Sequence, residues 1–239
     1  MRKSRMLVFS LALSAAVVAP SLAMGQLTWY TDRQAFRDDN RNHGKILKGI
    51  EDFEGSTLPP NSVVGMDDPL VFGIPNGPYP DGLSVENLVV QSRQVDGTPR
   101  GAGGLAAASV GFAGAASDVV LANFFVDSLD LIFLDELKSG VGFDTLGFIG
   151  GPTVDVEVFD LAGNSLGSMN FAADPAGSNF AGVWSDVAIG RINIFDPADI
   201  GGAEGGDNIE MWIVPEPTSM IALLGGGLML LARRLRRKA

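Results

Sequence analysis

Short apolar or alternating segments separated by turn residues dominate the chain from Ile50 to Ile213. Glycine, proline, asparagine and aspartate cluster between these segments, and the whole sequence contains 31 glycines and 13 prolines. Such segments are typical of β-strands, and no helical crossover of the length that parallel strands require lies between them. The pattern therefore predicts an all-β antiparallel sandwich, and a jelly roll fits it best.

Eleven strands are predicted on this basis. They cover Ile50–Glu54, Val63–Val71, Leu83–Val90, Ala106–Phe112, Val119–Phe125, Leu129–Phe133, Val141–Gly147, Thr153–Asp160, Ser165–Ala172, Ile189–Phe195 and Asn208–Ile213. The clearest pair is Thr153–Asp160 with Ser165–Ala172. Its first strand alternates three valines with two acidic residues, which gives one buried and one wet face. Gly163 between the two strands allows the positive φ of a hairpin turn.

One short helix is predicted near the start of the mature chain. Thr31 or Asp32 can cap it, because either side chain accepts a hydrogen bond from an N–H group of the first turn. Ala35 and Phe36 are expected to face inward. The charged side chains of this segment are expected to face outward: Arg33, Arg37, Asp38 and Asp39.

The first 25 residues have the three parts of a secretory signal peptide for export by the Sec pathway. A basic start precedes an apolar run from Met6 to Ala19, and small residues follow at the spacing that a signal peptidase reads. Cleavage after Ser21–Ala23 or Ala23–Gly25 would place the mature N-terminus at Met24 or Gln26. An uncleaved anchor is the alternative, but the apolar run is short for a membrane span.

The C-terminal segment combines a proline motif, an apolar run and a basic end. The motif is Pro215, Glu216 and Pro217, and the apolar run extends from Met220 to Ala232. A helix over that run would be about 20 Å long, short of a hydrocarbon core of about 30 Å, so flanking residues must help it to span. The positive-inside rule keeps the basic end cytoplasmic and places the preceding chain outside the inner membrane. The basic end contains Arg233, Arg234, Arg236, Arg237 and Lys238.

This tail resembles the PEP-CTERM sorting signal of Gram-negative bacteria that make extracellular polysaccharide. The resemblance implies recognition by an exosortase, a membrane cysteine transpeptidase, followed by removal of the apolar helix and transfer to the cell surface or extracellular matrix. A plain membrane anchor that is retained is the alternative. The chain then divides into a signal peptide (1–25), a β-sandwich domain (26–213) and a sorting tail with its transmembrane helix (214–239).

Three segments of the body resemble parts of PEP-CTERM sandwich domains related to carbohydrate-binding modules. They are Asp52–Gly55, Phe180–Ile194 and Asp207–Glu210. These are folding patterns rather than catalytic motifs. The resemblance implies a lectin-like jelly roll with a non-enzymatic structural or glycan-binding role, linked to extracellular polysaccharide or biofilm.

A surface polysaccharide hydrolase is the alternative function. Such an enzyme needs two carboxylates about 5 to 10 Å apart, and no sequence pattern identifies such a pair. Asp155 and Glu157 lie on the wet face of a predicted strand, where solubility is the ordinary explanation. A Gly-x-Ser-x-Gly nucleophile elbow is absent. Gly101–Ala106 has the glycine spacing of a dinucleotide-binding fingerprint, but the strand-turn-helix unit that such a site requires does not surround it.

Composition excludes several kinds of partner and site. Without residues 1–25 and the segment after Pro217, nine Lys and Arg remain against 28 Asp and Glu, a net charge of 9 − 28 = −19, which argues against nucleic acid and anionic lipid. The chain has no cysteine, so disulfides, zinc thiolates and cysteine nucleophiles are excluded. The single histidine, His43, lies in a polar stretch and is expected to be solvated surface.

Calcium is the ion that this acidic body would bind, because Ca²⁺ takes six to eight oxygen ligands. A jelly roll brings its first and last strands side by side, so Asp52 and Glu54 are expected to meet Asp207 and Asn208. The same residues also fit polar strand ends beside turns. The acidic loop from Asp196 to Glu204 is a weaker candidate.

Aromatic side chains are the candidates for stacking on sugar rings. They are Trp29, Tyr30, Tyr79, Trp184 and Trp212. Trp184 and Trp212 lie in or between predicted strands, so each fits a core layer as well as a groove.

Overall fold

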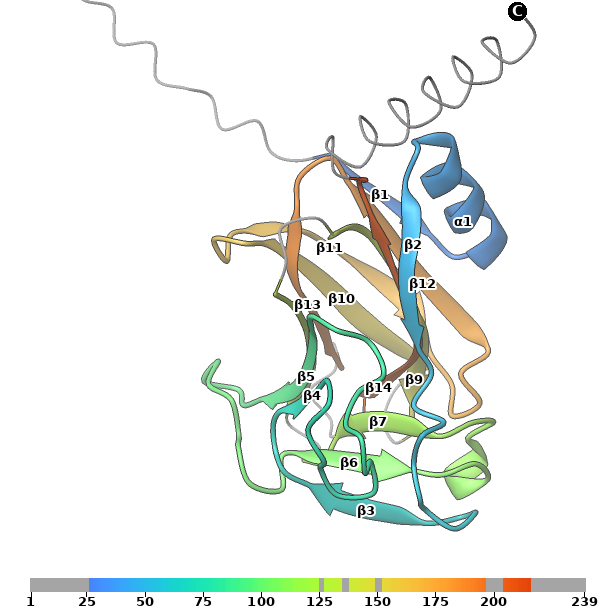
Figure 1. Ribbon diagram of the computed structural model, residues 1–239, viewed down its shortest axis with the longest axis vertical. Coiled ribbons are helices and arrows are strands. Elements are labelled where there is room, and N and C mark those ends of the chain that lie inside the picture. The colour runs from blue at the N-terminus through green and yellow to red at the C-terminus, as the bar shows by residue number, and fades with distance from the viewer. Residues whose placement is uncertain (1–25, 125–126, 135–137, 149–151, 197–203, 216–239) are drawn as a thin grey trace, which may run out of the picture.

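A computed structural model describes residues 26–124, 127–134, 138–148, 152–196 and 204–215. Two antiparallel sheets pack face to face, with one α-helix against the larger sheet (Figure 1). This arrangement confirms the predicted antiparallel β-sandwich. The signal peptide and nearly all of the sorting tail lie outside the described residues. Within the described residues, no helix is long and apolar enough to cross a membrane.

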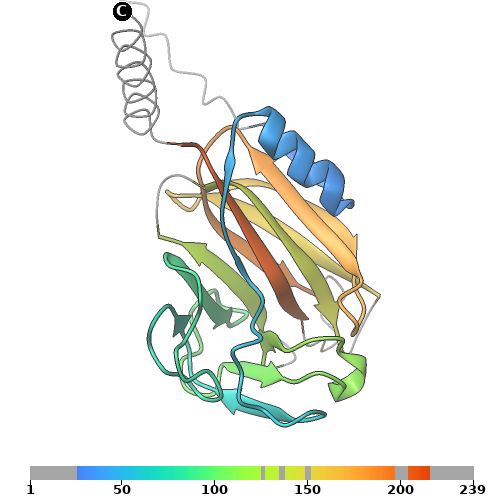
Figure 2. The ribbon, with the colours of Figure 1, turned by 45° about the vertical axis from the view of Figure 1, so that its right-hand side comes forward.

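The larger sheet, sheet A, has the strand order β1-β12-β9-β14-β7-β6-β3. Its eighth strand, β2, lies outside this order and pairs with β14. Helix α1 (Arg33–Asn42) lies against the outer face of this sheet, over β12 and β9 (Figure 2). The strands of sheet A are β1 (Leu27–Tyr30), β2 (Ile46–Glu51), β3 (Val63–Met66), β6 (Leu105–Ala108), β7 (Val119–Ala122), β9 (Lys138–Gly147), β12 (Asn179–Ser185) and β14 (Glu204–Ile213).

The smaller sheet, sheet B, has the order β11-β10-β13-β8-β5-β4. Its strands are β4 (Leu70–Val71), β5 (Leu88–Arg93), β8 (Ser128–Phe133), β10 (Thr153–Asp160), β11 (Ser165–Ala172) and β13 (Ile189–Phe195). A short 3-10 helix, η1 (Phe112–Gly114), follows β6.

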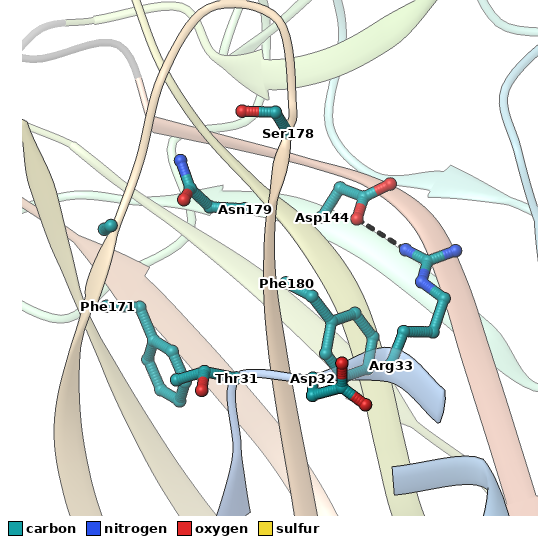
Figure 3. A pocket seen from close by; sticks show the side chains of 9 residues that line it. Thr31, Asp32, Arg33, Asp144, Phe171, Ser178, Asn179 and Phe180 are labelled. Carbon is teal, nitrogen blue, oxygen red and sulfur yellow. Dashed lines mark hydrogen bonds and ion pairs between the residues drawn. The ribbon is translucent and has the colours of Figure 1, made fainter. Parts of the chain in front are cut away.

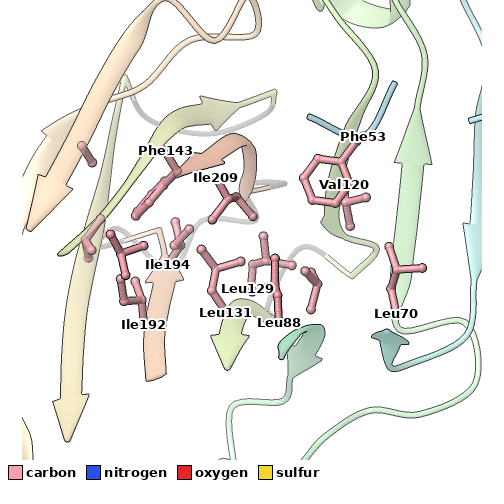
Figure 4. Close-up of a cluster of buried hydrophobic side chains, with 14 of the residues drawn as sticks. Phe53, Leu70, Leu88, Val120, Leu129, Leu131, Phe143, Ile192, Ile194 and Ile209 are labelled. Atoms are coloured by element: carbon pink, nitrogen blue, oxygen red, sulfur yellow. The ribbon is translucent and has the colours of Figure 1, made fainter. Parts of the chain in front are cut away.

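The main core lies between the two sheets. Phe143 and Ile209 come from sheet A, while Leu131, Ile192 and Ile194 come from sheet B, and all five are at most 1% exposed (Figure 4). The three valines of β10 also point into this core, and the alternating acidic residues do not, as their spacing predicts. Burial of one face of each sheet therefore positions the opposite faces for polar contacts.

Three predicted strands have the observed bounds, namely β10, β11 and β13. The predicted strand Val63–Val71 was wrong as a single strand, because a cis Asp68–Pro69 bond lies between β3 and β4. Likewise, β2 ends at Glu51 because Phe53 has a φ of 56°, so the predicted strand Ile50–Glu54 begins and ends too late. Strand β1 was not predicted, and β12 was not identified as a separate strand.

Helix α1 confirms only part of its prediction. Asp32 is the N-cap, since its Oδ1 accepts a hydrogen bond from the Ala35 N–H at 2.7 Å, and Phe36 is fully buried. Ala35 is exposed, so its predicted inward direction is wrong. Asn40, one turn beyond Phe36, is buried instead, because residues four apart share a helix face.

Three glycines of sheet A lie beneath this helix and contact it closely. A Cβ at Gly140 would lie 2.2 Å from Asn40 Oδ1, and one at Gly142 would lie 2.6 Å from Phe180 Cζ and 2.8 Å from Phe36 Cε1. A Cβ at Gly182 on β12 would also contact Phe180 and Phe36, at 2.8 and 3.0 Å. These positions leave room for a helix because they carry no side chains.

Strand β14 divides sheet A. One of its edges pairs with β9, whereas the other is shared by β7, at Gly205 and Gly206, and by β2, at Ile209–Ile213. Asn208 has a φ of 50° where the pairing changes, and the register with β9 shifts there. At this interruption the side chains of Asp207 and Asn208 are not held in the alternating directions of a regular strand.

The close packing of α1 on these glycines leads to a stability prediction. We expect Gly142→Ala to lower the free energy of unfolding by about 1–3 kcal/mol, the usual cost of overpacking, because two aromatic rings would have to move. Urea denaturation followed by circular dichroism measures the change. Gly55→Ala is the matched control, because a Cβ there meets nothing within 4 Å and its φ is not positive. An equal loss in both variants would contradict the packing role of Gly142.

Candidate functional site

A pocket of about 330 Å³ opens beside the N-terminus of α1, between the helix and sheet A (Figure 3). We call it the α1 pocket. Its lining comes from the start of α1, from β9, from the end of β11, from the β11–β12 connection and from the start of β12. It consists of Thr31, Asp32, Arg33, Asp144, Phe171, Ala172, Ser178, Asn179 and Phe180. Polar side chains therefore surround two aromatic rings.

The aromatic part of the pocket is fixed by packing. Phe171 is 2% exposed and contacts Trp29 with ring centroids 5.9 Å apart. Phe180 is 8% exposed and packs against Phe36 at 5.5 Å. The Arg33 guanidinium lies 4.9 Å from the centroid of the Phe180 ring, a cation–π distance.

A network of charges holds the polar side of the pocket. Arg33 Nη2 donates to Asp144 Oδ1 at 2.5 Å, and Arg33 Nη1 lies 3.3 Å from Glu210 Oε1. Arg37, one turn later on α1, donates to both carboxylate oxygens of Glu210 at 2.6 and 2.9 Å. Glu210 has no exposed side-chain surface, so the two arginines compensate a fully buried charge.

The prediction that Arg33 and Arg37 face outward is therefore wrong. Both are half-buried, because their stems extend over the sheet and their guanidinium groups reach acids of β9 and β14. Asp38 is exposed, as predicted. Asp39 is half-buried and accepts a hydrogen bond from the Tyr30 hydroxyl at 2.5 Å.

Asp144 is the acid that reaches the pocket. Burial raises the pKa of its carboxyl, while Arg33 and a hydrogen bond from Asn208 oppose that shift. Asn208 Nδ2 donates to Asp144 Oδ2 at 3.0 Å, so both oxygens of Asp144 have partners. The carboxylate is thus positioned by α1 on one side and by the interrupted part of β14 on the other.

The predicted calcium ligands are only partly brought together. Glu54 is exposed and Asp207 is 2% exposed, and the charge of Glu54 contributes to raising the pKa of Asp207 to about 7, after burial as the main cause. Asp52 is exposed and accepts a hydrogen bond from the Glu54 N–H at 3.3 Å, as in a turn. Within the described part of the chain, no group of three His, Asp or Glu is placed to hold a metal ion. Calcium binding stays a prediction.

The other acidic candidates lie elsewhere. Asp155 and Glu157 lie on the outer face of sheet B, where they accept hydrogen bonds from Asn170 and Ser165 at 2.7 and 2.6 Å. Glu204 is 2% exposed, and burial raises its pKa to about 7 with a smaller contribution from the charge of Asp196. Most of the acidic loop between those two residues lies outside the described chain.

The five aromatic candidates do not form an exposed platform. Tyr79 and Trp212 are 2% exposed, and Trp29, Tyr30 and Trp184 are half-buried. His43 is exposed, as predicted, and its ring lies 5.0 Å from that of Trp184.

Asp144 and Glu210 were not predicted as partners of α1. One signal was available: arginines at positions 33, 37 and 41 recur every four residues and so share one helix face. Their partners are 111 and 173 residues away along the chain, and only the sheet topology brings them together.

The arginine network leads to a second stability prediction. We expect Arg37→Met to lower the free energy of unfolding by about 2–3 kcal/mol, less than the about 3–5 kcal/mol of a fully broken buried pair, because Arg33 still faces Glu210. Arg41→Met is the control on the same helix, since Arg41 pairs with exposed Asp38 and should cost about 0–1 kcal/mol. Chemical denaturation of both variants measures the difference, and equal costs would contradict the role of Arg37.

The C-terminal sorting segment begins almost directly at the sheet. Strand β14 ends at Ile213, and Val214 and Pro215 are the last described residues. Glu216, Pro217, the predicted transmembrane helix and the basic end lie outside the described chain.

Comparisons with known proteins agree with the tail. Residues 214–238 match the model of the PEP-CTERM protein-sorting motif. The chain therefore carries the sorting signal of an exported protein directed to the cell envelope and surface. No curated protein has a sequence that matches this chain. One similar solved structure is a point mutant of CBM29-2, studied for ligand recognition by family 29 carbohydrate-binding modules. It is 13% identical over 52% of this chain and 89% of that chain, with a TM-score of 0.30.

Proposed function

We propose that this PEP-CTERM-bearing chain is a surface or extracellular-matrix protein of a Gram-negative bacterium, and that it binds a glycan in the α1 pocket without hydrolysing it. Export by Sec removes residues 1–25, the body at 26–213 folds outside the inner membrane, and the tail at 214–239 is processed by an exosortase. The glycan belongs to extracellular polysaccharide or biofilm. The observation that carries the binding role is the composition of the pocket.

The sorting part of the proposal is supported by the order of the tail elements. The motif is followed by an apolar run and then by five basic residues between Arg233 and Lys238. The apolar run alone is shorter than a comfortable membrane span, which suits a segment that is removed after use. Removal also takes five positive charges from an already acidic protein.

Processing of the tail can be tested by mass spectrometry of the native protein. We expect the surface pool to lack peptides from residues 220–239 and to end near Pro217, with an adduct if the protein has been transferred. A Glu216→Ala variant should keep the intact tail and remain in the membrane fraction. A surface pool that ends at Ala239 would contradict exosortase processing.

Three features of the α1 pocket suit a sugar ligand. The pocket combines planar polar groups, such as Asp32 and Asn179, which can pair with hydroxyl groups, with two largely buried phenylalanines that form an apolar wall. Its rim is open, because Thr31, Asp32 and Ser178 are exposed. Its volume is near the lower end of the range for ligand sites, about 300–1,000 Å³, so it fits a short part of a glycan.

Hydrolysis is the second candidate, because Asp32 and Asp144 both line the pocket. A glycosidase needs one carboxyl that donates a proton and one that attacks or activates water. Here Asp144 is engaged by Arg33 and Asn208, while Asp32 Oδ1 is engaged by the first turn of α1. These partners favour two structural carboxylates over an acid–base pair.

Binding can be tested with the full chain in detergent on an array of bacterial polysaccharide fragments. We expect Thr31→Val to weaken binding about five- to tenfold, since one hydrogen bond contributes about 1 kcal/mol. Ser168→Ala is the control, because Ser168 is an exposed hydroxyl on β11 outside the pocket. Equal affinity of both variants, or no bound glycan, would contradict the binding role.

The same fragments separate binding from hydrolysis. We expect no release of reducing ends from any fragment that binds. Release that is lost in Asp144→Asn but kept in Ser168→Ala would instead establish the hydrolase.

A further inference from the structure

Exposed apolar side chains gather at the end of sheet A where β14 ends. Ile46, Leu47 and Val214 are 51%, 42% and 49% exposed. They adjoin one another, because Ile46 pairs with Ile213, Leu47 pairs with Trp212, and Val214 is the next residue after β14. We call these three residues the apolar tip. Figures 1 and 2 show this end of the molecule, with the start of β2 beside the end of β14.

Packing within the chain leaves the apolar tip uncovered. Strand β2 pairs with β14 along one edge, and no other strand of the described ranges pairs with its second edge. A single exposed apolar side chain is ordinary on a protein surface. Adjoining ones mark a surface that contacts another protein or a membrane.

Cationic side chains border the apolar tip. Arg41, in the last turn of α1, is exposed, and its guanidinium lies 5.7 Å from the ring centroid of Trp212, the partner of Leu47. Lys48 follows Leu47 and is also exposed. The segment 38–48 contains three Lys and Arg against two Asp, a net charge of 3 − 2 = +1, whereas the body carries −19. This end is therefore the part of the body that phosphate groups repel least.

The sorting tail leaves the body at the same end. Pro215 follows Val214, and the apolar run that is predicted to enter the membrane begins at Met220. The six residues from Val214 to Ser219 span at most about 20 Å. The headgroup layer on each side of the hydrocarbon core is only about 5–8 Å thick, so the apolar tip reaches the bilayer surface while the tail is inserted. So short a tether gives a high effective concentration, and a weak contact is then sufficient.

We propose that the apolar tip rests on the lipid bilayer while the tail is inserted, with Arg41 and Lys48 at the lipid phosphate groups. The inference rests on the proposed function, because it requires the tail to enter the inner membrane. Apolar side chains lose contact with water in the headgroup region, and long cationic side chains keep their charge hydrated there. The contact holds the sorting motif at the membrane surface, where the exosortase of the proposed function acts.

The contact leaves the α1 pocket open to the solution. The pocket lies at the N-terminus of α1, where Asp32 and Arg33 line it, whereas Arg41 brings the opposite end of the helix to the apolar tip. Ten helical residues separate the two by about 15 Å. A chain anchored in this way could therefore still bind a glycan.

The contact can be tested with one introduced cysteine, because the chain has none of its own. The full chain with Leu47→Cys is labelled with an environment-sensitive fluorophore and incorporated into phosphatidylcholine vesicles at fewer than one chain per vesicle. Val63→Cys is the matched control, since Val63 is 45% exposed and lies on β3, at the opposite end of the sandwich (Figure 1).

We expect the label at position 47 to shift to the blue and to emit about two- to threefold more strongly in vesicles, because it leaves water for the headgroup region. Spin-labelled lipid headgroups should quench it. The label at position 63 should do neither. Adding Ile46→Asp to the Leu47→Cys chain should return the emission toward its value in water without releasing the chain from the vesicles.

Flotation of the vesicles tests the tail separately from the contact. A chain that does not float with them would contradict insertion of the tail, and with it both the contact and the membrane step of the proposed function. A chain that floats, but whose labels at positions 47 and 63 behave alike, would overturn the contact alone. A blue shift that appears only at many chains per vesicle would assign the apolar tip to a second copy and would also overturn the proposal.

Discussion

The pairing of β14 with three different strands is the constraint on which the rest of the structure depends. Its edge toward β9 pairs along the strand with register shifts after Asp207 and after Trp212, whereas its other edge pairs with β7 first and with β2 afterwards. A regular strand cannot change partners without an interruption, and the left-handed Asn208 provides it. The same two residues then make polar contacts: Asn208 donates to Asp144 in the α1 pocket and to Asp207, and Asp207 accepts a hydrogen bond from the Ser117 hydroxyl. One irregular position in the central strand therefore helps to position the acid of the α1 pocket.

The helix depends on the same sheet through space and charge. Glycines at positions 140, 142 and 182 leave the outer face low enough for Phe36 and Asn40 to approach the backbone. Packing alone would leave Glu210 buried and uncompensated beneath the helix, but Arg33 and Arg37 reach it from one face of α1. Each feature requires the other, since without the glycines the helix could not approach, and without the arginines its approach would bury a lone charge. The pocket is the space that remains where this contact ends at the helix N-terminus.

The sequence predicts local structure, but it does not predict features that depend on contacts between segments far apart in the chain. Alternation in Thr153–Asp160 predicts both the strand and its buried face. The position before a helical segment narrows the cap to Thr31 or Asp32, of which Asp32 is the cap. The direction of Ala35 is not predictable in the same way, because only the absence of a side chain at Gly140 makes Asn40 the better residue to bury. The charge partners of α1 lie on β9 and β14, and no spacing within a helix reveals them. Of the four expected calcium residues, Asp52 serves a turn and Asn208 donates to Asp144, contacts that the sequence does not reveal.

The position of the sorting motif adds a mechanical consequence. Pro215 follows the last residue of β14 by two positions, so the tail is joined to the central strand of sheet A without an intervening linker. At about 3.3 Å per residue, the four residues from Val214 to Pro217 span at most about 13 Å. A body attached near Pro217 would therefore be held close to its anchor and restricted in its orientation. Strand β1 begins at the same end of sheet A as the end of β14. Leu27 pairs there with Ser185, the last residue of β12, and Ile213, the last residue of β14, pairs with Ile46. The first described strand and the last one therefore approach the same end of sheet A, so the chain enters and leaves the sandwich there.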